Sequence, residues 1–311
     1  MLTHLIILLD DTSVSYCHYE VNRKERRLIS LEDLKAGIMF AMKENLNIQF
    51  VYPGYELPAE YLEAIDTIDH TDIKPAANGE RADVVVLNGW KDDVSEGATC
   101  IIRSSRQALL DNLTTLSDWL GCVARLNVVL MDVETFTDKD IDNYKQTLDA
   151  VADIVVKTYQ TGKSVQLNLL TDRLMLSEMN NCGAGDSNVT LAPNGKFYLC
   201  PAFYYEDEGQ SVGDLSGGLG IRNPQLLRLD HAPICRQCDA YQCRRCIWTN
   251  QRLTMDANTP SHQQCVVAHL ERNASRELQI KMGKMGIRII NSQPIEELQE
   301  LDPFNIVNKW K

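Results

Sequence analysis

Seven of the ten cysteines in this 311-residue chain lie between positions 182 and 265. In order they are Cys182, Cys200, Cys235, Cys238, Cys243, Cys246 and Cys265. Two Cys-x2-Cys pairs place two thiolates in one tight turn, where both can bind the same metal ion or cluster. Four close cysteines could also form a zinc site, but seven exceed the ligands of one tetrahedral zinc ion. The spacing therefore predicts a metal site, with iron–sulfur clusters and zinc as alternatives.

The composition is that of a soluble cytoplasmic protein. A chain of this length buries roughly 75% of its unfolded surface and needs no disulfide bonds to stabilise a core. The opening residues, MLTHLIILLDD, have neither the basic start nor the long apolar stretch of a secretion signal. No run reaches the roughly 20 apolar residues of a membrane span. We therefore expect no membrane partner and a reducing compartment, where clustered cysteines bind metal or do chemistry.

The charge balance argues against nucleic acid as a partner. The chain has 43 acidic and 31 basic residues, which gives a net charge of −12. Most of such a surface would repel a phosphate backbone.

Apolar runs alternate with helical patterns in the first half of the chain, which is typical of parallel strands joined by helices. The expected strands are 5–10, 48–52, 82–88, 99–104, 126–133 and 164–170. The expected helices are 30–45, 58–66, 106–125 and a long segment between the last two strands. About six βα units are fewer than the eight of a closed barrel, so we expect an α/β, partial (β/α)6 TIM-like barrel. Ligands of such sheets bind at the carboxyl ends of the strands, where residues 10–20 would lie.

One of these helices illustrates the pattern. Ser30 followed by Asp33 is a capping signal. The spacing then predicts one shared helix face made of Leu34, Ile38, Met39 and Met42.

The composition of the sequence changes after about residue 175, where glycines and cysteines become frequent and the periodic apolar pattern ends. We expect three parts: a barrel-like domain (1–175), a cysteine-rich domain (176–275) and a tail (276–311) that packs on the body.

The order of cysteines and glycines in the second part resembles the SPASM domain, an auxiliary iron–sulfur module of radical SAM enzymes that modify peptides. The segment QSVGDLSGG (210–218) resembles the glycine turn of such domains, while two cysteine spacings are one residue shorter than the family pattern. The resemblance implies one [4Fe-4S] cluster on Cys235, Cys238, Cys243 and Cys265, and another on Cys182, Cys200 and Cys246. The second set is one ligand short; Asp186 is a candidate oxygen ligand, and an open iron site is the alternative.

The loop after the first strand resembles the cluster loop of radical SAM enzymes, which carries Cys-x3-Cys-x2-Cys. YCHY looks like its end, with Cys17 as the third cysteine. Counting back places Val14 and Asp10 at the other two positions, so the resemblance implies that no catalytic cluster is held there. Cleavage of S-adenosylmethionine by this chain alone is therefore not expected.

A second radical SAM motif is altered in the same way. The family uses Gly-Gly-Glu after the second strand to bind the amino group of the cofactor, and this chain has Gly54, Tyr55 and Glu56. Gly54 and Glu56 would be the remnant of the cofactor-binding motif.

Residues 8–20 together with 243–275 resemble the CXXX repeat peptide maturase family, whose members are radical-SAM-like. The resemblance covers nearly the whole chain. The resemblance implies maturation of a ribosomally made precursor peptide with cysteine repeats. We expect a subunit that does not cleave S-adenosylmethionine, binds the precursor and assists an intact radical SAM partner enzyme through auxiliary [4Fe-4S] clusters. One alternative is a stand-alone, non-radical peptide-modifying enzyme that uses Asp10, Glu56 and Asp132; another is a zinc-stabilised peptide-binding protein. No catalytic residue is assigned.

The remaining candidate ligands have simpler interpretations. Cys100 and Cys122 fall in a predicted strand and helix and are expected to be core thiols. His18, His262 and His269 stand alone in polar contexts, which favours surface or capping roles.

Overall fold

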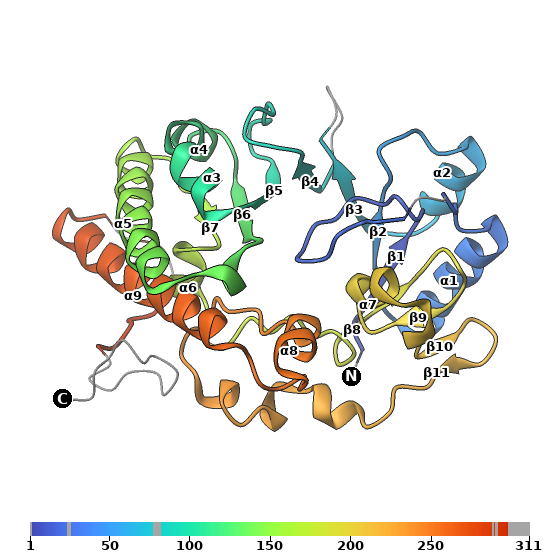
Figure 1. Cartoon of the computed structure of the whole chain (residues 1–311). Coiled ribbons are helices and arrows are strands. Elements are labelled where there is room, and N and C mark those ends of the chain that lie inside the picture. The colour runs from blue at the N-terminus through green and yellow to red at the C-terminus, as the bar shows by residue number, and fades with distance from the viewer. Residues whose placement is uncertain (1, 24–25, 77–81, 288, 290–291, 298–311) are drawn as a thin grey trace. The chain divides into compact units, whose positions relative to one another are not determined.

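The computed structural model describes residues 2–23, 26–76, 82–287, 289 and 292–297, and its chain forms two compact units (Figure 1). The first unit comprises residues 1–88 and 183–232, and the second comprises 89–182 and 233–311. These limits differ from the three parts expected from the sequence composition. The division into a barrel-like domain, a cysteine-rich domain and a tail stays a prediction. The expected start of the tail, at 276, lies inside a continuous helix.

The first unit has a mostly parallel sheet. Its strands are β1 (His4–Leu8), β2 (Asn47–Val51), β3 (His70–Pro75), β4 (Val84–Leu87), β8 (Asn188–Leu191) and β9 (Phe197–Tyr198). They follow the order β4-β3-β2-β1-β8-β9, in which only β9 is antiparallel to its neighbour. Leu5 pairs in register with Ile48 on one side and Val189 on the other. The loops after β1, β2 and β8 therefore leave the same edge of the sheet.

Short helices and a hairpin complete this unit. They are α1 (Leu31–Glu44), α2 (Ala59–Ile65), α7 (Pro201–Glu206), and the strands β10 (Gly213–Asp214) and β11 (Gly218–Leu219). As predicted, Ser30 caps α1, because its hydroxyl accepts the Asp33 N–H at 3.0 Å.

The apolar face predicted for α1 is only partly buried. Leu34, Ile38 and Ala41 are buried against the core, but Met39 and Met42 are 64% and 59% exposed. The buried stripe of the helix follows residues 34, 38 and 41, and both methionines lie to one side of it.

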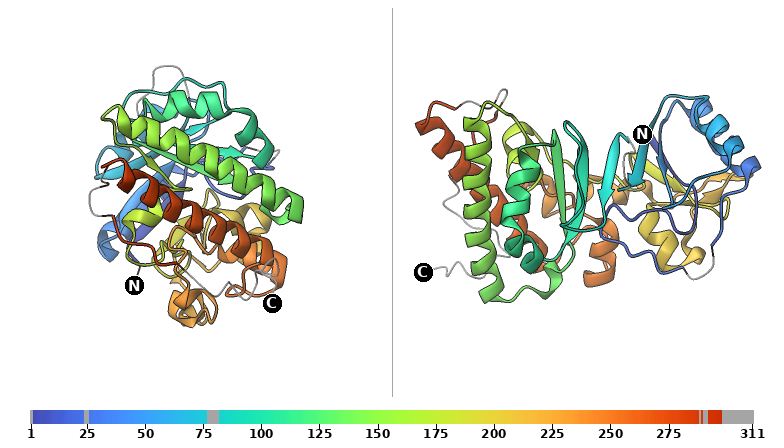
Figure 2. Two further views of the ribbon diagram at one scale, coloured as in Figure 1. Left: turned by 90° about the vertical axis from the view of Figure 1, so that its left-hand side faces the viewer. Right: turned by 90° about the horizontal axis from the view of Figure 1, so that it is seen from above.

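The second unit has a parallel three-stranded arrangement with longer helices. Its strands are β5 (Thr99–Ser104), β6 (Arg125–Leu130) and β7 (Gln166–Leu167), in the order β7-β6-β5. Its α-helices are α3 (Arg106–Asp111), α4 (Leu113–Leu120), α5 (Asp138–Gln160), α6 (Thr171–Met175), α8 (Ile247–Thr254) and α9 (His262–Lys284). The two longest, α5 and α9, pack side by side (Figure 2). Both begin with a capping box, at Thr137 and Ser261.

The sequence patterns located most elements but not all of them. The prediction of parallel strands joined by helices is confirmed. The expected helix 106–125 is broken at Asn112, whose backbone leaves the helical region and whose side chain donates to the Ala108 carbonyl at 2.7 Å. Strand β3 was not predicted, because Ile73 is its one buried residue and its sequence, HTDIKP, has no apolar run.

Candidate functional site

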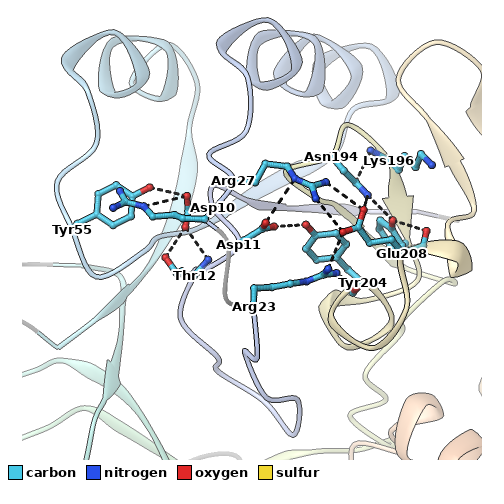
Figure 3. Close-up of polar contacts among 12 residues, drawn as sticks. Asp10, Asp11, Thr12, Arg23, Arg27, Tyr55, Asn194, Lys196, Tyr204 and Glu208 are labelled. Carbon is cyan, nitrogen blue, oxygen red and sulfur yellow. Dashed lines mark hydrogen bonds and ion pairs between the residues drawn. The ribbon is translucent and has the colours of Figure 1, made fainter.

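The loop after β1 is closed by its own polar side chains. Asp10 is fully buried, and its Oδ1 accepts the backbone N–H of Thr12 at 2.8 Å and the Thr12 hydroxyl at 2.5 Å (Figure 3). Ser13 donates from its hydroxyl to the Val51 carbonyl at 2.7 Å, and the Val14 N–H donates to the Tyr52 carbonyl at 2.9 Å. These bonds tie the loop after β1 to the end of β2.

Two further side chains fill the space beside Asp10. The Tyr55 hydroxyl donates to Asp10 Oδ2 at 2.8 Å. The guanidinium of Arg26 stacks over the Tyr55 ring at 3.2 Å from its centroid and lies 3.7 Å from the same carboxylate oxygen. Gly54 and Glu56, which flank Tyr55, are exposed in the loop after β2. The tripeptide expected as a cofactor motif therefore turns its tyrosine, and not its glutamate, toward the end of β1.

Cys17 lies further along the same loop. Its Sγ is 3.6 Å from Nδ1 of His18, and both residues are half-buried. Asp132, which one alternative grouped with Asp10, belongs to the second unit. Its carboxylate accepts the backbone N–H of Arg106, the first residue of α3, at 3.0 Å.

A second polar network at this edge joins the loop after β1 to α7 (Figure 3). The Tyr204 hydroxyl donates to the buried Asp11 carboxylate, and Arg27 Nε lies 3.7 Å from Asp11 Oδ2. Burial raises the pKa of Asp11, and the contacts with Tyr204 and Arg27 oppose this rise. Burial and the bond to Asp11 raise the pKa of Tyr204, so its hydroxyl keeps the proton it donates.

Glu208 balances the arginines of this network. Arg23 Nη1 donates to Glu208 Oε1 at 2.8 Å, and Arg23 Nη2 donates to the Tyr204 carbonyl at 2.8 Å. Burial alone would raise the pKa of Glu208, but hydrogen bonds from Asn194 and Arg27 lower it overall. Glu208 is therefore a carboxylate with fixed partners, and the network is neutralised internally.

The tyrosine pair of α7 gives a direct test of this network. Tyr204→Phe is expected to lower the free energy of unfolding by about 1–3 kcal/mol, because it leaves the buried Asp11 without a donor. Tyr205→Phe is the matched control: among the described residues its buried hydroxyl has no hydrogen-bond partner, so its removal is expected to be neutral or stabilising. Urea unfolding followed by circular dichroism measures both changes.

The contact between Asp11 and Tyr204 also predicts how the free energy of unfolding depends on pH. Because the pKa of Asp11 is raised in the folded protein, the folded state holds more protons than the unfolded state as this carboxyl titrates. Stability therefore falls as the pH rises through that range, and the fall is expected to be steeper in Tyr204→Phe. Equal losses in the two variants at all pH values would contradict the assigned role of Tyr204.

The cysteine run of the second unit forms a compact loop. Cys235 begins a short 3-10 turn, η5 (Cys235–Gln237), and its carbonyl accepts the Cys238 N–H at 3.1 Å. Cys238 Sγ accepts the Ala240 N–H at 3.5 Å. Burial raises the pKa of the Cys243 thiol to about 12, and the nearby Cys235 and Cys238 add to this rise. Three predicted ligands of one cluster thus share a neighbourhood.

Helix α9 carries two further donors, of which His269 contacts this loop. Cys265 lies in its first turn, and His269 follows one turn later on the same face. His269 Nε2 is 3.4 Å from Cys238 Sγ. The expected surface or capping role of His269 was therefore wrong. Its i, i+4 spacing from Cys265 on a capped helix was the available sequence signal.

The second predicted ligand set is divided between the two units. Cys182 and Cys246 belong to the second unit, where the Cys182 N–H donates to the Arg244 carbonyl at 2.8 Å. Cys200 belongs to the first unit and precedes α7. Asp186 lies in the tight turn after Gly183, whose φ is +71°.

The loop offers donors of the type that binds zinc or iron–sulfur clusters, namely cysteine sulfurs, one of which also accepts a backbone N–H. Within the described ranges, however, no three His, Cys, Asp or Glu side chains are close enough together to hold a metal ion. The assignment of both ligand sets therefore stays a prediction.

Comparisons with known proteins find similarity only in structure, since no protein-family model and no curated protein matches the chain. A solved structure of hexahistidine-tagged anSMEcpe with bound AdoMet matches with a TM-score of 0.58 and 11% identity, over 93% of this chain and 100% of that chain. This chain has the same fold. Streptococcus suis SuiB bound to precursor peptide SuiA matches with a TM-score of 0.42 and 13% identity, over 66% of this chain and 60% of that chain.

The first match supports the expected α/β fold with a mostly parallel sheet. As for membranes, none of the helices in the described part of the chain has the length and apolar character needed to cross one.

Proposed function

We propose that this chain is a radical-SAM-like subunit that does not cleave S-adenosylmethionine and that takes part in maturation of a cysteine-repeat precursor peptide. It would work in the cytoplasm beside an intact radical SAM enzyme. The observation that carries the first part of this proposal is the filled end of β1, where Asp10 is held by Thr12 and Tyr55.

The contacts at β1 support the loss of a catalytic centre. A cluster that binds the cofactor needs three thiolates and leaves one iron open, whereas this loop offers Asp10, Val14 and Cys17. Asp10 is fully buried and already accepts three hydrogen bonds. Arg26 on the Tyr55 ring adds bulk and positive charge there. These side chains would have to move before an iron–sulfur cluster could bind.

The cysteine loop supports retention of an auxiliary centre. We assign Cys235, Cys238, Cys243 and Cys265 to one [4Fe-4S] cluster of a SPASM-type module, and Cys182, Cys200 and Cys246 to a second. Such a cluster, when bound, supplies one-electron transfer at a potential set by its surroundings. The chain itself supplies the thiols and the Ala240 N–H, which donates to Cys238 Sγ at 3.5 Å.

The peptide partner rests on the sequence resemblance of residues 8–20 and 243–275 to CXXX repeat peptide maturases. A precursor with regularly spaced cysteines is the expected ligand. Gly54 and Glu56, which are exposed, would be a remnant of a cofactor motif without a remaining role in cleavage.

One anaerobic preparation of the full chain tests the proposal. We expect iron and acid-labile sulfide in the protein, and no 5′-deoxyadenosine after incubation with S-adenosylmethionine and dithionite. A synthetic peptide with several Cys-x3 repeats should bind, and the same peptide with serine at each cysteine should bind more weakly. Formation of 5′-deoxyadenosine by this chain alone would overturn the proposal. Zinc without sulfide would instead favour a zinc-stabilised peptide-binding protein.

A further inference from the structure

A groove lies at the amino-terminal edge of the sheet in the first unit. Its volume is about 440 Å³, and apolar and polar residues share its lining. They include Leu2, Asp186, Leu219, Ile221, Gln225 and Arg228. Leu2 precedes β1 and Asp186 precedes β8, and these two strands run parallel. The groove is therefore at the edge opposite the loop after β1, away from Asp10 and Tyr55.

Close packing fixes the walls of this groove. Gly185 belongs to its lining and has a φ of +75°, and a Cβ at this position would lie 2.5 Å from Leu227 Cδ1. Only glycine fits such a turn. Leu227 is buried and ends the short turn η3 (Pro224–Leu227), whose first residue also lines the groove. The groove is therefore largely formed before a ligand binds.

Strand β11 borders the groove and has an open side. Within the described chain it pairs with β10 alone, in a two-stranded antiparallel ribbon (Figure 1). The Gly220 N–H donates to the Val212 carbonyl at 2.7 Å, and Leu219 lies opposite Gly213. In this register the backbone N–H and carbonyl of Leu219 point away from β10. They form an edge with which an extended chain can pair.

The side chains beside this edge suit a peptide with regularly spaced cysteines. Leu219 and Ile221 both line the groove, because alternate residues of an extended segment share a face. The same rule places all cysteines of a Cys-x3 repeat on one face of a strand, since each follows the last by an even step. A thiol packs as a small apolar group. Arg228 lies at the rim, and its ion pair with Asp230 is exposed and weak, so its guanidinium can donate to a peptide.

We propose that an extended segment of the cysteine-repeat precursor pairs with the open side of β11 and places its cysteine face in the groove, an inference that rests on the proposed function. The Leu219 backbone exchanges hydrogen bonds with the peptide, and Leu2 and Ile221 cover its thiols. Gln225 and Arg228 donate to carbonyl or carboxylate groups of the peptide at the rim. Binding is non-covalent and uses the thiols only as apolar groups.

Fluorescence anisotropy of a labelled Cys-x3 repeat peptide with the reduced full chain tests the inference without altering the protein. Aminobutyrate at each cysteine keeps the apolar volume, so this peptide should bind within about twofold of the original, whereas serine should weaken binding about tenfold. N-methylation of one alternate set of backbone amides removes donors but keeps every side chain. The set that faces β11 should weaken binding about tenfold, and the other set should not.

A pair of variants places the peptide on the protein. Ile221→Glu puts a charge in the groove and should weaken binding about tenfold. Leu62→Glu is the matched control, because Leu62 is 40% exposed on α2 of the same unit, and it should bind as the unmodified chain does. Circular dichroism checks that both variants are folded. Hydrogen exchange of the unmodified chain gives a further measurement, in which the Leu219 amide should become protected when the peptide binds.

The outcomes separate this inference from the proposed function. If the cysteine peptide binds, but both N-methylated peptides and Ile221→Glu bind as tightly, the inference is wrong and the proposed function stands. If the aminobutyrate peptide does not bind while the cysteine peptide does, sulfur chemistry governs recognition and the inference is again wrong. If no repeat peptide binds the unmodified chain, the peptide partner of the proposed function is itself overturned.

Discussion

Replacing Asp239 by alanine is expected to lower the free energy of unfolding by about 3–5 kcal/mol, because it leaves two buried guanidinium groups without their shared carboxylate. Arg272 and Arg173 are only 1% and 4% exposed, and both direct Nη2 at Asp239 Oδ2, at 2.6 and 3.4 Å. Burial also lowers the pKa of Arg173, while Asp239 opposes this change. Removal of the carboxylate therefore leaves charge that the interior cannot solvate.

An exposed ion pair of the same chain provides the control. Arg228 and Asp230 are 2.9 Å apart, but their side chains are 54% and 57% exposed. Asp230→Ala is expected to change the free energy of unfolding by less than about 1 kcal/mol. Urea unfolding followed by circular dichroism measures both variants, because Asp230 belongs to the first unit and Asp239 to the second. Similar losses for the two variants would show that burial does not govern the Asp239 site.

Replacing Cys243 by serine is expected to remove one cluster's iron and acid-labile sulfide from the anaerobically purified protein. Cys243 is a half-buried predicted ligand of the loop, and burial together with the nearby Cys235 and Cys238 raises its thiol pKa to about 12. A cysteine thiol must lose its proton to bind a metal, and metal binding supplies the free energy for this. Serine keeps the volume but has no soft donor, so the cluster should be lost while the fold around α9 remains.

The matched control for Cys243 is Cys122, a half-buried thiol of the same unit that contacts the Val94 carbonyl at 3.6 Å. Cys122→Ser should leave iron and sulfide unchanged. Metal analysis and the absorbance of the cluster measure both variants. Unchanged iron in Cys243→Ser, with loss in Cys122→Ser, would refute the ligand assignment.

The local elements of this fold were largely readable from the sequence because their signals are local. Thr99–Ser104 is a strand as expected, and Ser30 caps the helix that its spacing predicted. Strand β3 was missed because its stability comes from its pairing with β2 and β4, and not from its own residues. The exposed Met39 and Met42 show the same limit, since a periodic pattern does not fix which edge of an apolar stripe meets the core.

The sequence by itself determined the chemical types available: sulfur donors at metal-binding spacings, and a first loop without the three cysteines of a catalytic cluster. Only the tertiary structure decided which side chains meet. It directs Tyr55 to Asp10, His269 to Cys238, and Arg272 and Arg173 to Asp239. These partners are separated by 31 residues or more along the chain, so no local spacing rule relates them. Their contacts arise when strands and helices bury their apolar faces.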